Sequence, residues 1–251
     1  DLPTGSLADS THACTAGRSF PERGGYPDLR GLRAFCRSRF PQPLPLGQGA
    51  APGAARAGEG EAILKSFKII DSLCYVPTLE VVRDLITTNI DGISSIEPGD
   101  FDGLTSLTHL ELCSNQISSL EPGDFSGLGN LGLLHLGNNE ITSIEPGDFS
   151  GLGNLWVLYL TGNPITSIES GDFSGLTNLE WLSLGQNQLS SIETGDFSEL
   201  TKLETLSLYD NRLSNIESGV FSGLTNLEIL DLTRNRLSNI ESGVFSGLTN
   251  L

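Results

Sequence analysis

Residues 107–130 read LTHLELCSNQISSLEPGDFSGLGN, and close copies of this 24-residue unit follow one another to the end of the chain. With Leu107 as position 1, apolar residues fill positions 1, 4, 6, 11, 14, 19 and 22. Six complete units occupy 107–250, and position 9 is always Asn: Asn115, Asn139, Asn163, Asn187, Asn211 and Asn235. A fixed period of this length indicates a solenoid, in which each unit packs mainly against its neighbours.

The spacing inside one unit predicts its local structure. Leu at positions 4 and 6, between variable residues at 3, 5 and 7, gives the period-two alternation of a short strand with one buried face. The Asn at position 9 follows this strand, where its amide can bond backbone groups that the turn leaves unpaired. Gly at position 17 supplies turn geometry on the far side. One unit buries too little apolar surface to offset the entropy of ordering it, so stability must come from stacking.

Residues 83–106 form a degenerate first copy of the unit. Thr88 and Asp91 stand where the other copies carry Leu and Asn. Five residues are predicted to keep the apolar frame: Ile86, Ile93, Ile96, Phe101 and Leu104. Leu251 would be position 1 of a seventh unit, so we expect an array truncated at its C-terminus.

The composition changes near residue 62. All ten Ala and seven of the 12 Pro lie in 1–62, where large apolar residues are sparse. We therefore predict a low-complexity, disordered segment over 1–62, an N-terminal flank or cap over 63–82, and repeats over 83–251. Residues 1–62 would also fit a propeptide, a linker or a mispredicted coding start. They lack the apolar core of a usual signal peptide.

The charge of the chain restricts its partners. Residues 83–251 carry five basic against 23 acidic side chains, a charge of 5 − 23 = −18, so the repeats account for all of the chain's net charge of −17. Phosphate binding needs a cationic face, which makes nucleic acid an improbable partner. The longest apolar runs fall well short of the ~18 residues that a membrane-spanning helix needs, so no span is expected.

The repeated pattern, L-x-x-L-x-L-x-x-N-x-I/L-x-x-I/L-x-x-G-x-F-x-G-L, resembles the leucine-rich repeat family. It is most similar to the typical 24-residue class found in Toll-like receptors, small leucine-rich proteoglycans and lamprey variable lymphocyte receptors. The resemblance implies an α/β-type repeat solenoid, a curved horseshoe with a parallel β-sheet on its concave face and mostly loops on its convex side. It also implies a receptor-like binding role at the cell surface or outside the cell.

Three features depart from the family pattern, and one of them is the absence of a C-terminal cap. Glu replaces the usual Pro after position 14 in every unit. The Cys-rich N-terminal cap of the family is not matched by Cys14, Cys36 and Cys74. The chain also has no N-x-S/T glycosylation site, which favours a bacterial or environmental member, or an unglycosylated surface.

Variation between the internal copies indicates where a partner binds. Residues 212–226 and 236–250 are identical, whereas the preceding strand segments, 203–211 and 227–235, differ at positions 3, 5, 7 and 8. These positions point away from the Leu face, so we interpret them as a diversified concave surface centred on exposed aromatic residues. Drift on an unconstrained surface is the alternative. The predicted ligand-binding set is His109, Glu111, His135, Trp156, Tyr159, Trp181, Ser183, Thr205, Ser207, Tyr209, Ile229 and Asp231.

One group of residues on this face could carry chemistry. His109, Glu111 and Cys113 alternate along one strand, and His135 follows on the next, a set that could ligate zinc or form a Cys/His nucleophile. An open sheet, however, neither removes water from such a group nor supplies an oxyanion hole. We therefore expect contact residues, with no catalytic or metal site, no cofactor and no enzyme activity.

A second group is an acidic ladder on the loop side. We expect it to be solvated, with weak divalent-cation binding as the alternative. It consists of Glu97, Glu121, Glu145, Glu169, Glu193, Glu217 and Glu241 together with Asp100, Asp124, Asp148, Asp172 and Asp196.

The sequence thus predicts a recognition scaffold that binds a protein or glycan through its concave face. A structural, envelope- or matrix-like spacer without a cognate ligand is the alternative. At the C-terminal end, Leu224, Phe245 and Leu248 are predicted to lack a covering unit, so the chain should fray or weakly self-associate there.

Overall fold

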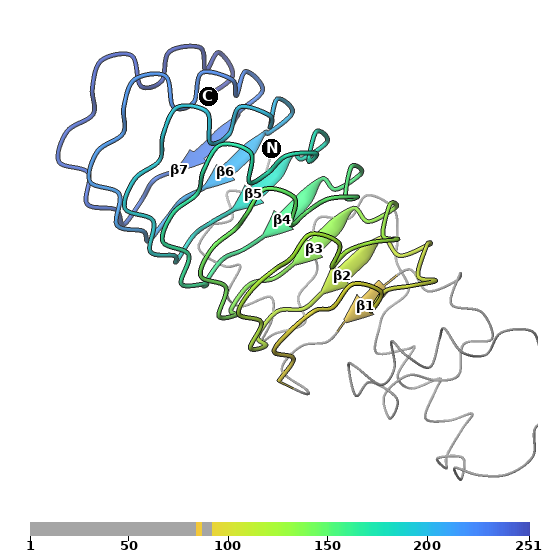
Figure 1. Ribbon diagram of the computed structural model, residues 1–251. Coiled ribbons are helices and arrows are strands. Elements are labelled where there is room, and N and C mark those ends of the chain that lie inside the picture. Colours follow the sequence, from red (N-terminus) through yellow and green to blue (C-terminus); the bar gives the residue numbers. More distant parts are fainter. Residues whose placement is uncertain (1–83, 87–91) are drawn as a thin grey trace, which may run out of the picture.

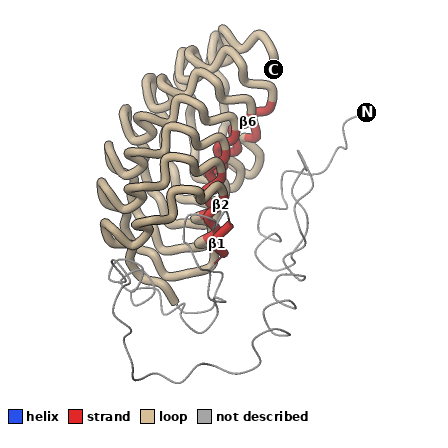
Figure 2. Tube along the Cα trace, turned by 90° about the vertical axis from the view of Figure 1, so that its right-hand side faces the viewer, coloured by secondary structure: helices blue, strands red, loops and turns tan. Residues whose placement is uncertain are grey.

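The computed structural model describes residues 84–86 and 92–251; the predictions for 1–62 and 63–82 lie outside this range. Seven short parallel strands form one sheet in chain order. Figure 1 shows successive units stacked side by side, and Figure 2 shows the strands along one face with loops around the rest. The described residues contain no helix, and the predicted solenoid with a parallel concave sheet is confirmed. The strands are β1 (Asp84–Ile86), β2 (His109–Glu111), β3 (Leu133–His135), β4 (Val157–Tyr159), β5 (Trp181–Ser183), β6 (Thr205–Ser207) and β7 (Ile229–Asp231).

Strand register follows the 24-residue period from β2 onward. Leu110 pairs with Leu134, and the same step continues to β7. At the first strand the predicted frame is wrong by one residue, because Leu85 rather than Ile86 pairs with Leu110. Ile93 and Ile96 are buried where the frame placed them. The first copy is therefore one residue longer than the others between its strand and that of the next unit.

The core is a column of repeated apolar side chains. The Leu residues at positions 1, 4 and 6 have almost no exposed surface through the first five complete units. Phe at position 19 forms a continuous ladder from Phe101 to Phe245, with neighbouring ring centroids 6.2–6.5 Å apart and nearly parallel. Each ring thus packs against the same ring of the next unit, which explains why the period is kept so strictly.

The Asn residues at position 9 form an Asn ladder, in which each Asn hydrogen-bonds its own unit to the one before it. The ladder consists of Asn115, Asn139, Asn163, Asn187, Asn211 and Asn235. Asn163 donates from Nδ2 to the carbonyl oxygens of Leu136 (3.0 Å) and Leu160 (2.9 Å), and its Oδ1 accepts from the N–H of Ile141 (3.1 Å). Leu136 and Ile141 belong to the preceding unit. Because these backbone groups are buried, the amide satisfies donors and acceptors that water cannot reach, as the sequence predicted.

The loop-side acidic ladder divides by burial. The Glu residues are exposed, but all five Asp residues named above are buried, so the expectation of a solvated ladder is wrong for them. The Oδ2 atom of Asp124 accepts the N–H of Glu121 at 2.8 Å, which closes the turn and draws the carboxyl inward. Burial raises the pKa of Asp124 to about 6, and that of Asp172 likewise to about 6.

The C-terminal end exposes apolar surface, although not at every residue predicted. Phe245 is 40% exposed and Leu248 is only partly buried, as expected. Leu224 is 1% exposed, so its prediction is wrong: the unit 227–250 follows its own unit and covers it. Ile240 and Leu251 are also exposed at this end.

Candidate functional site on the concave sheet

Burial divides the predicted binding set into three groups. Trp156 and Ile229 are each 42% exposed. Five residues of the set are half-buried: His109, Glu111, Tyr159, Trp181 and Asp231. The other five are buried, and the expectation of a freely exposed surface is wrong for them: His135, Ser183, Thr205, Ser207 and Tyr209. Period-two alternation sets the direction of a side chain but not how much its neighbours cover it.

The aromatic residues of the concave face form a row across three strands. The His135 ring on β3 lies 4.9 Å from the Tyr159 ring on β4, which in turn lies 6.3 Å from Trp181 on β5. Trp156 precedes β4 and packs over Gly132, where an added Cβ would lie 2.9 Å from the indole Cδ1. Tyr159 is therefore in the middle of the row, with His135 at one end and Trp181 at the other. Trp156 lies beside it.

The concave face of the complete units carries no Lys or Arg at positions 3, 5 and 7. Burial lowers the pKa of His135 to about 4, so its ring is neutral at pH 7. Burial, with the nearby charge of Glu111, raises the pKa of Tyr159 to about 12. Glu111 and Asp231 thus leave the face neutral to acidic.

Two buried polar groups on neighbouring strands have no hydrogen-bond partner. They are the indole N–H of Trp181 on β5 and the hydroxyl of Ser207 on β6. By contrast, the Ser183 hydroxyl is bonded to that of Thr161 at 2.6 Å. Leaving a buried donor or acceptor unsatisfied costs about 1–3 kcal/mol. Both atoms are covered by neighbouring groups, so a ligand reaches them only if those groups move.

Tyr209 has a packing role. An added Cβ at Gly185, the equivalent position in the preceding unit, would overlap the Tyr209 ring. The aromatic ring therefore fills the space that a missing side chain leaves in the neighbouring unit. Its variation between copies reflects paired packing as well as surface change.

The zinc-site and Cys/His-nucleophile alternatives both required the thiol of Cys113, and this thiol is not available. Cys113 is disulfide-bonded, so its sulfur offers neither a thiolate nucleophile nor a zinc ligand. Within 84–86 and 92–251, no group of three or more His, Cys, Asp or Glu side chains is placed to hold a metal ion. His109 has its Nδ1 bonded to the hydroxyl of Thr108 at 2.9 Å.

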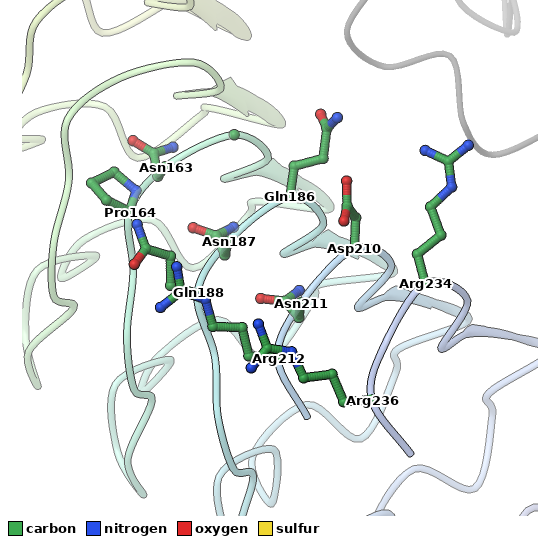
Figure 3. Close-up of a pocket in the computed structure, with 11 residues that line it drawn as sticks. Asn163, Pro164, Gln186, Asn187, Gln188, Asp210, Asn211, Arg212, Arg234 and Arg236 are labelled. Carbon is green, nitrogen blue, oxygen red and sulfur yellow. The ribbon is translucent and has the colours of Figure 1, made fainter. Parts of the chain in front are cut away.

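A groove that the sequence analysis missed lies beside the concave face. It has a volume of about 600 Å³ and follows the C-terminal ends of β4–β7. Figure 3 shows the side chains that line it. The overlooked signal was the clustering of Arg: three of the five basic residues in 83–251 occupy positions 8 and 10 of the last two units, Arg212, Arg234 and Arg236.

Comparison with known proteins agrees with this architecture. The family model for the leucine rich repeat matches 105–165, 157–213 and 201–251, which together exceed half of the chain. The chain belongs to the leucine-rich repeat family. This leucine-rich repeat chain is also similar to many solved structures, among them the crystal structure of a TLR13–ssRNA13 complex. The sequences are 38% identical and the TM-score is 0.65.

That match covers 67% of this chain but only 24% of the receptor chain, so the protein spans about a quarter of that relative. The leucine-rich repeat chain has no match among curated protein sequences. Neither the family model nor the TLR13 structure supports the expected bacterial or environmental origin. The part of the chain that the structure describes offers no helix long and apolar enough to cross a membrane.

Proposed function

We propose that this leucine-rich repeat chain is a non-catalytic recognition scaffold, extracellular or at the cell surface, that binds a partner through the concave face of β4–β6. The observation that carries the proposal is the contact between the Tyr159 and Trp181 rings across β4 and β5, with the exposed Trp156 beside them. The resemblance to a receptor in complex with a ligand supports the same class of role.

The aromatic row supplies the contact area. Tyr159 and Trp181 are half-buried, so each keeps part of its ring for a ligand while its neighbours hold its orientation. Aromatic side chains fixed in this way dominate the free energy of binding at protein interfaces. The exposed Trp156 and Ile229 would extend the contact on either side, and Asp231 would contribute to a polar rim.

The charge of the face favours a protein segment as the partner. A protein segment supplies apolar side chains that pack against the aromatic row, and a neutral or basic segment suits Glu111 and Asp231. A neutral glycan meets the same requirements less fully and is the alternative ligand. The TLR13 relative was crystallised with single-stranded RNA. Here the concave strands carry no Lys or Arg to neutralise phosphates, so RNA binding at this face should be weak.

The test is to select a ligand from displayed extracellular proteins and glycans, and then to measure its affinity for variants of the full chain. Trp181→Ala should cost about 2 kcal/mol or more, roughly 30-fold in Kd. Trp181→Phe keeps an aromatic ring and should cost less than Trp181→Ala, whereas Ser207→Ala changes a buried hydroxyl and should alter the affinity little. Glu145→Ala, on the loop side, is the control and should change little.

Two results would contradict the proposal. One is a ligand that binds the Trp181→Ala and Tyr159→Ala variants as tightly as the parent while loop-side changes abolish binding. The other is a selection that yields no ligand at all, which would favour the spacer role. Single-stranded RNA is included in the selection, and tight RNA binding that depends on Trp181 would overturn the assigned ligand class.

A further inference from the structure

The groove at the C-terminal ends of β4–β7 is built from two parallel rows of residues, which begin with Gly162 and Pro164 after β4. Position 8 of three successive units contributes Gln186, Asp210 and Arg234, and position 10 contributes Gln188, Arg212 and Arg236. Between the rows runs the Asn ladder, whose amides are already bonded to the backbone. Figure 3 shows both rows extending from consecutive loops on either side of this ladder.

The backbone holds the first row in place. Gln186, Asp210 and Arg234 all have left-handed backbone conformations, with φ of 52°, 54° and 56°. This conformation is unusual for residues other than Gly, and for Arg it brings a cost in free energy. Here it is repeated in every unit, so the three side chains leave the loop at the same angle.

The groove concentrates the positive charge of an acidic protein. Of the four Lys and Arg residues in 84–86 and 92–251, only Lys202 lies elsewhere, and its ammonium is bonded to Asn178 at 2.6 Å. The three guanidinium groups are exposed and form no ion pair or hydrogen bond with the described residues. Asp231, the acidic residue nearest to Arg234 along the chain, instead accepts two bonds from Thr233.

The groove is lined by cationic, anionic and neutral polar side chains, and this combination restricts the chemistry of the ligand. Three Arg side chains favour an anion and can bind a carboxylate or sulfate through paired N–H donors. Asp210 repels anions but accepts hydrogen bonds, and the amides of Gln186 and Gln188 both donate and accept. A ligand that fits all of these groups has one anionic group beside several hydroxyl groups.

We propose that this groove is a binding site for an acidic sugar, a saccharide unit that carries a carboxylate or a sulfate. A volume of about 600 Å³ is of the size that holds a small ligand. The net charge of −17 disfavours a long polyanion such as a nucleic acid, because only this edge of the described repeats is cationic. The site lies outside the concave aromatic row, so it does not depend on the function proposed above.

The first experiment measures binding of defined saccharides to the full chain by calorimetry. The probes are a hyaluronan tetrasaccharide, which carries only carboxylates, a keratan sulfate disaccharide, which carries only sulfate, and neutral chitotetraose. At least one acidic probe should bind at low salt, and chitotetraose should bind at least about tenfold more weakly. The two acidic probes distinguish the carboxylate from the sulfate form of the ligand.

Substitutions then locate the site. The double variant Arg212→Gln, Arg236→Gln should lose about tenfold or more in affinity, and so should Arg234→Asn, in which Asn tolerates the left-handed backbone. Lys202→Gln removes one equally exposed positive charge elsewhere and is the matched control, with no expected change. All four residues are exposed, so the melting temperature should stay the same and report that each variant folds.

Asp210→Asn separates a sugar site from a site for any anion. This change removes the repelling charge and keeps a residue that adopts φ near 54°. Affinity for free inorganic sulfate should rise, while affinity for the acidic saccharide should fall because a hydroxyl loses its carboxylate acceptor.

Four results would overturn the proposal. The first two are that chitotetraose binds as tightly as the acidic probes, and that the Arg substitutions leave the saccharide affinity unchanged. The third is that neither acidic probe binds at concentrations up to about 10 mM. The fourth is that poly-glutamate or oligouridylate binds more tightly than any saccharide and that this binding depends on the Arg residues. If the Arg variants lose saccharide binding but still bind the concave-face ligand, the groove and the concave face are separate sites, and the concave-face function is unaffected.

Discussion

Removing one rung of the Asn ladder should be far more costly in the middle of the solenoid than at its C-terminal end. Asn187 donates from Nδ2 to the carbonyl oxygens of Leu160, Leu184 and Gly185 at 3.0–3.1 Å, and accepts the N–H of Ile165 at 3.2 Å. Asn187→Ala removes all four bonds and leaves buried backbone groups without partners.

The size of the effect follows from burial. A bond of this kind contributes about 0.5–1.5 kcal/mol, and a buried group left unsatisfied costs about 1–3 kcal/mol, so Asn187→Ala should cost about 3–5 kcal/mol. Asn235 makes the equivalent four bonds, to Leu208, Leu232, Thr233 and Leu213, but is only partly buried. Water can replace those bonds, so Asn235→Ala should cost about 1–2 kcal/mol.

Urea unfolding of the full chain, followed by circular dichroism, measures both variants. Asn178→Ala is the surface control, because Asn178 is partly exposed and its side chain makes two exposed hydrogen bonds, one donated to Gly153 and one accepted from Lys202. Equal losses for Asn187→Ala and Asn235→Ala, or a loss below about 1 kcal/mol for Asn187→Ala, would refute the argument that the buried ladder holds adjacent units together.

Four further predictions concern stability. The raised pKa values of Asp124 and Asp172 (about 6) mean that the folded chain holds protons more tightly than the unfolded one. Their contribution to stability is full below pH 3.8 and is lost as pH rises through about 6, so the melting temperature should be higher at pH 5 than at pH 7.5, with the difference reduced in the Asp→Asn variants. Gly185→Ala should destabilise by about 1–3 kcal/mol through overlap with Tyr209, and a Gly185→Ala, Tyr209→Ala double mutant that is no better than the sum of its parts would contradict this. Raising salt to about 0.5 M, or adding millimolar calcium, should stabilise the repeats by screening the exposed Glu residues; an unchanged melting curve would remove this argument. A polar unit appended over Phe245 should raise the melting temperature and reduce concentration-dependent self-association in ultracentrifugation, and a sharply melting monomer without it would show that the end needs no cover.

The fold could be predicted from the sequence because stacking gives every unit the same environment. Position 19 must be Phe in each copy for the rings to stack at 6.2–6.5 Å, and position 9 must be Asn for its amide to reach both its own unit and the preceding one. A requirement that repeats in space appears as a repeat in the sequence. The degenerate first copy shows where this fails: without its Asn and Leu, the frame at Ile86 was misplaced by one residue.

The candidate site was less predictable because it depends on contacts across strands. Alternation predicts the direction of His135 and Ser207, but their burial comes from neighbours that the period does not reveal. Glu121 and Asp124 similarly appear alike as acidic residues of one turn. Only the hydrogen bond between them shows that the Asp is drawn inward. The groove was missed because the left-handed residue at position 8 has no fixed residue type.

The most direct test of the account is hydrogen–deuterium exchange of the full chain with and without the tightest ligand from the displayed selection. Concave-face recognition predicts slower exchange in β4, β5 and β6, at 157–159, 181–183 and 205–207, with the loop-side turns at 121–126 and 145–150 unchanged. Protection confined to those turns, with the three strands unaffected, would contradict it.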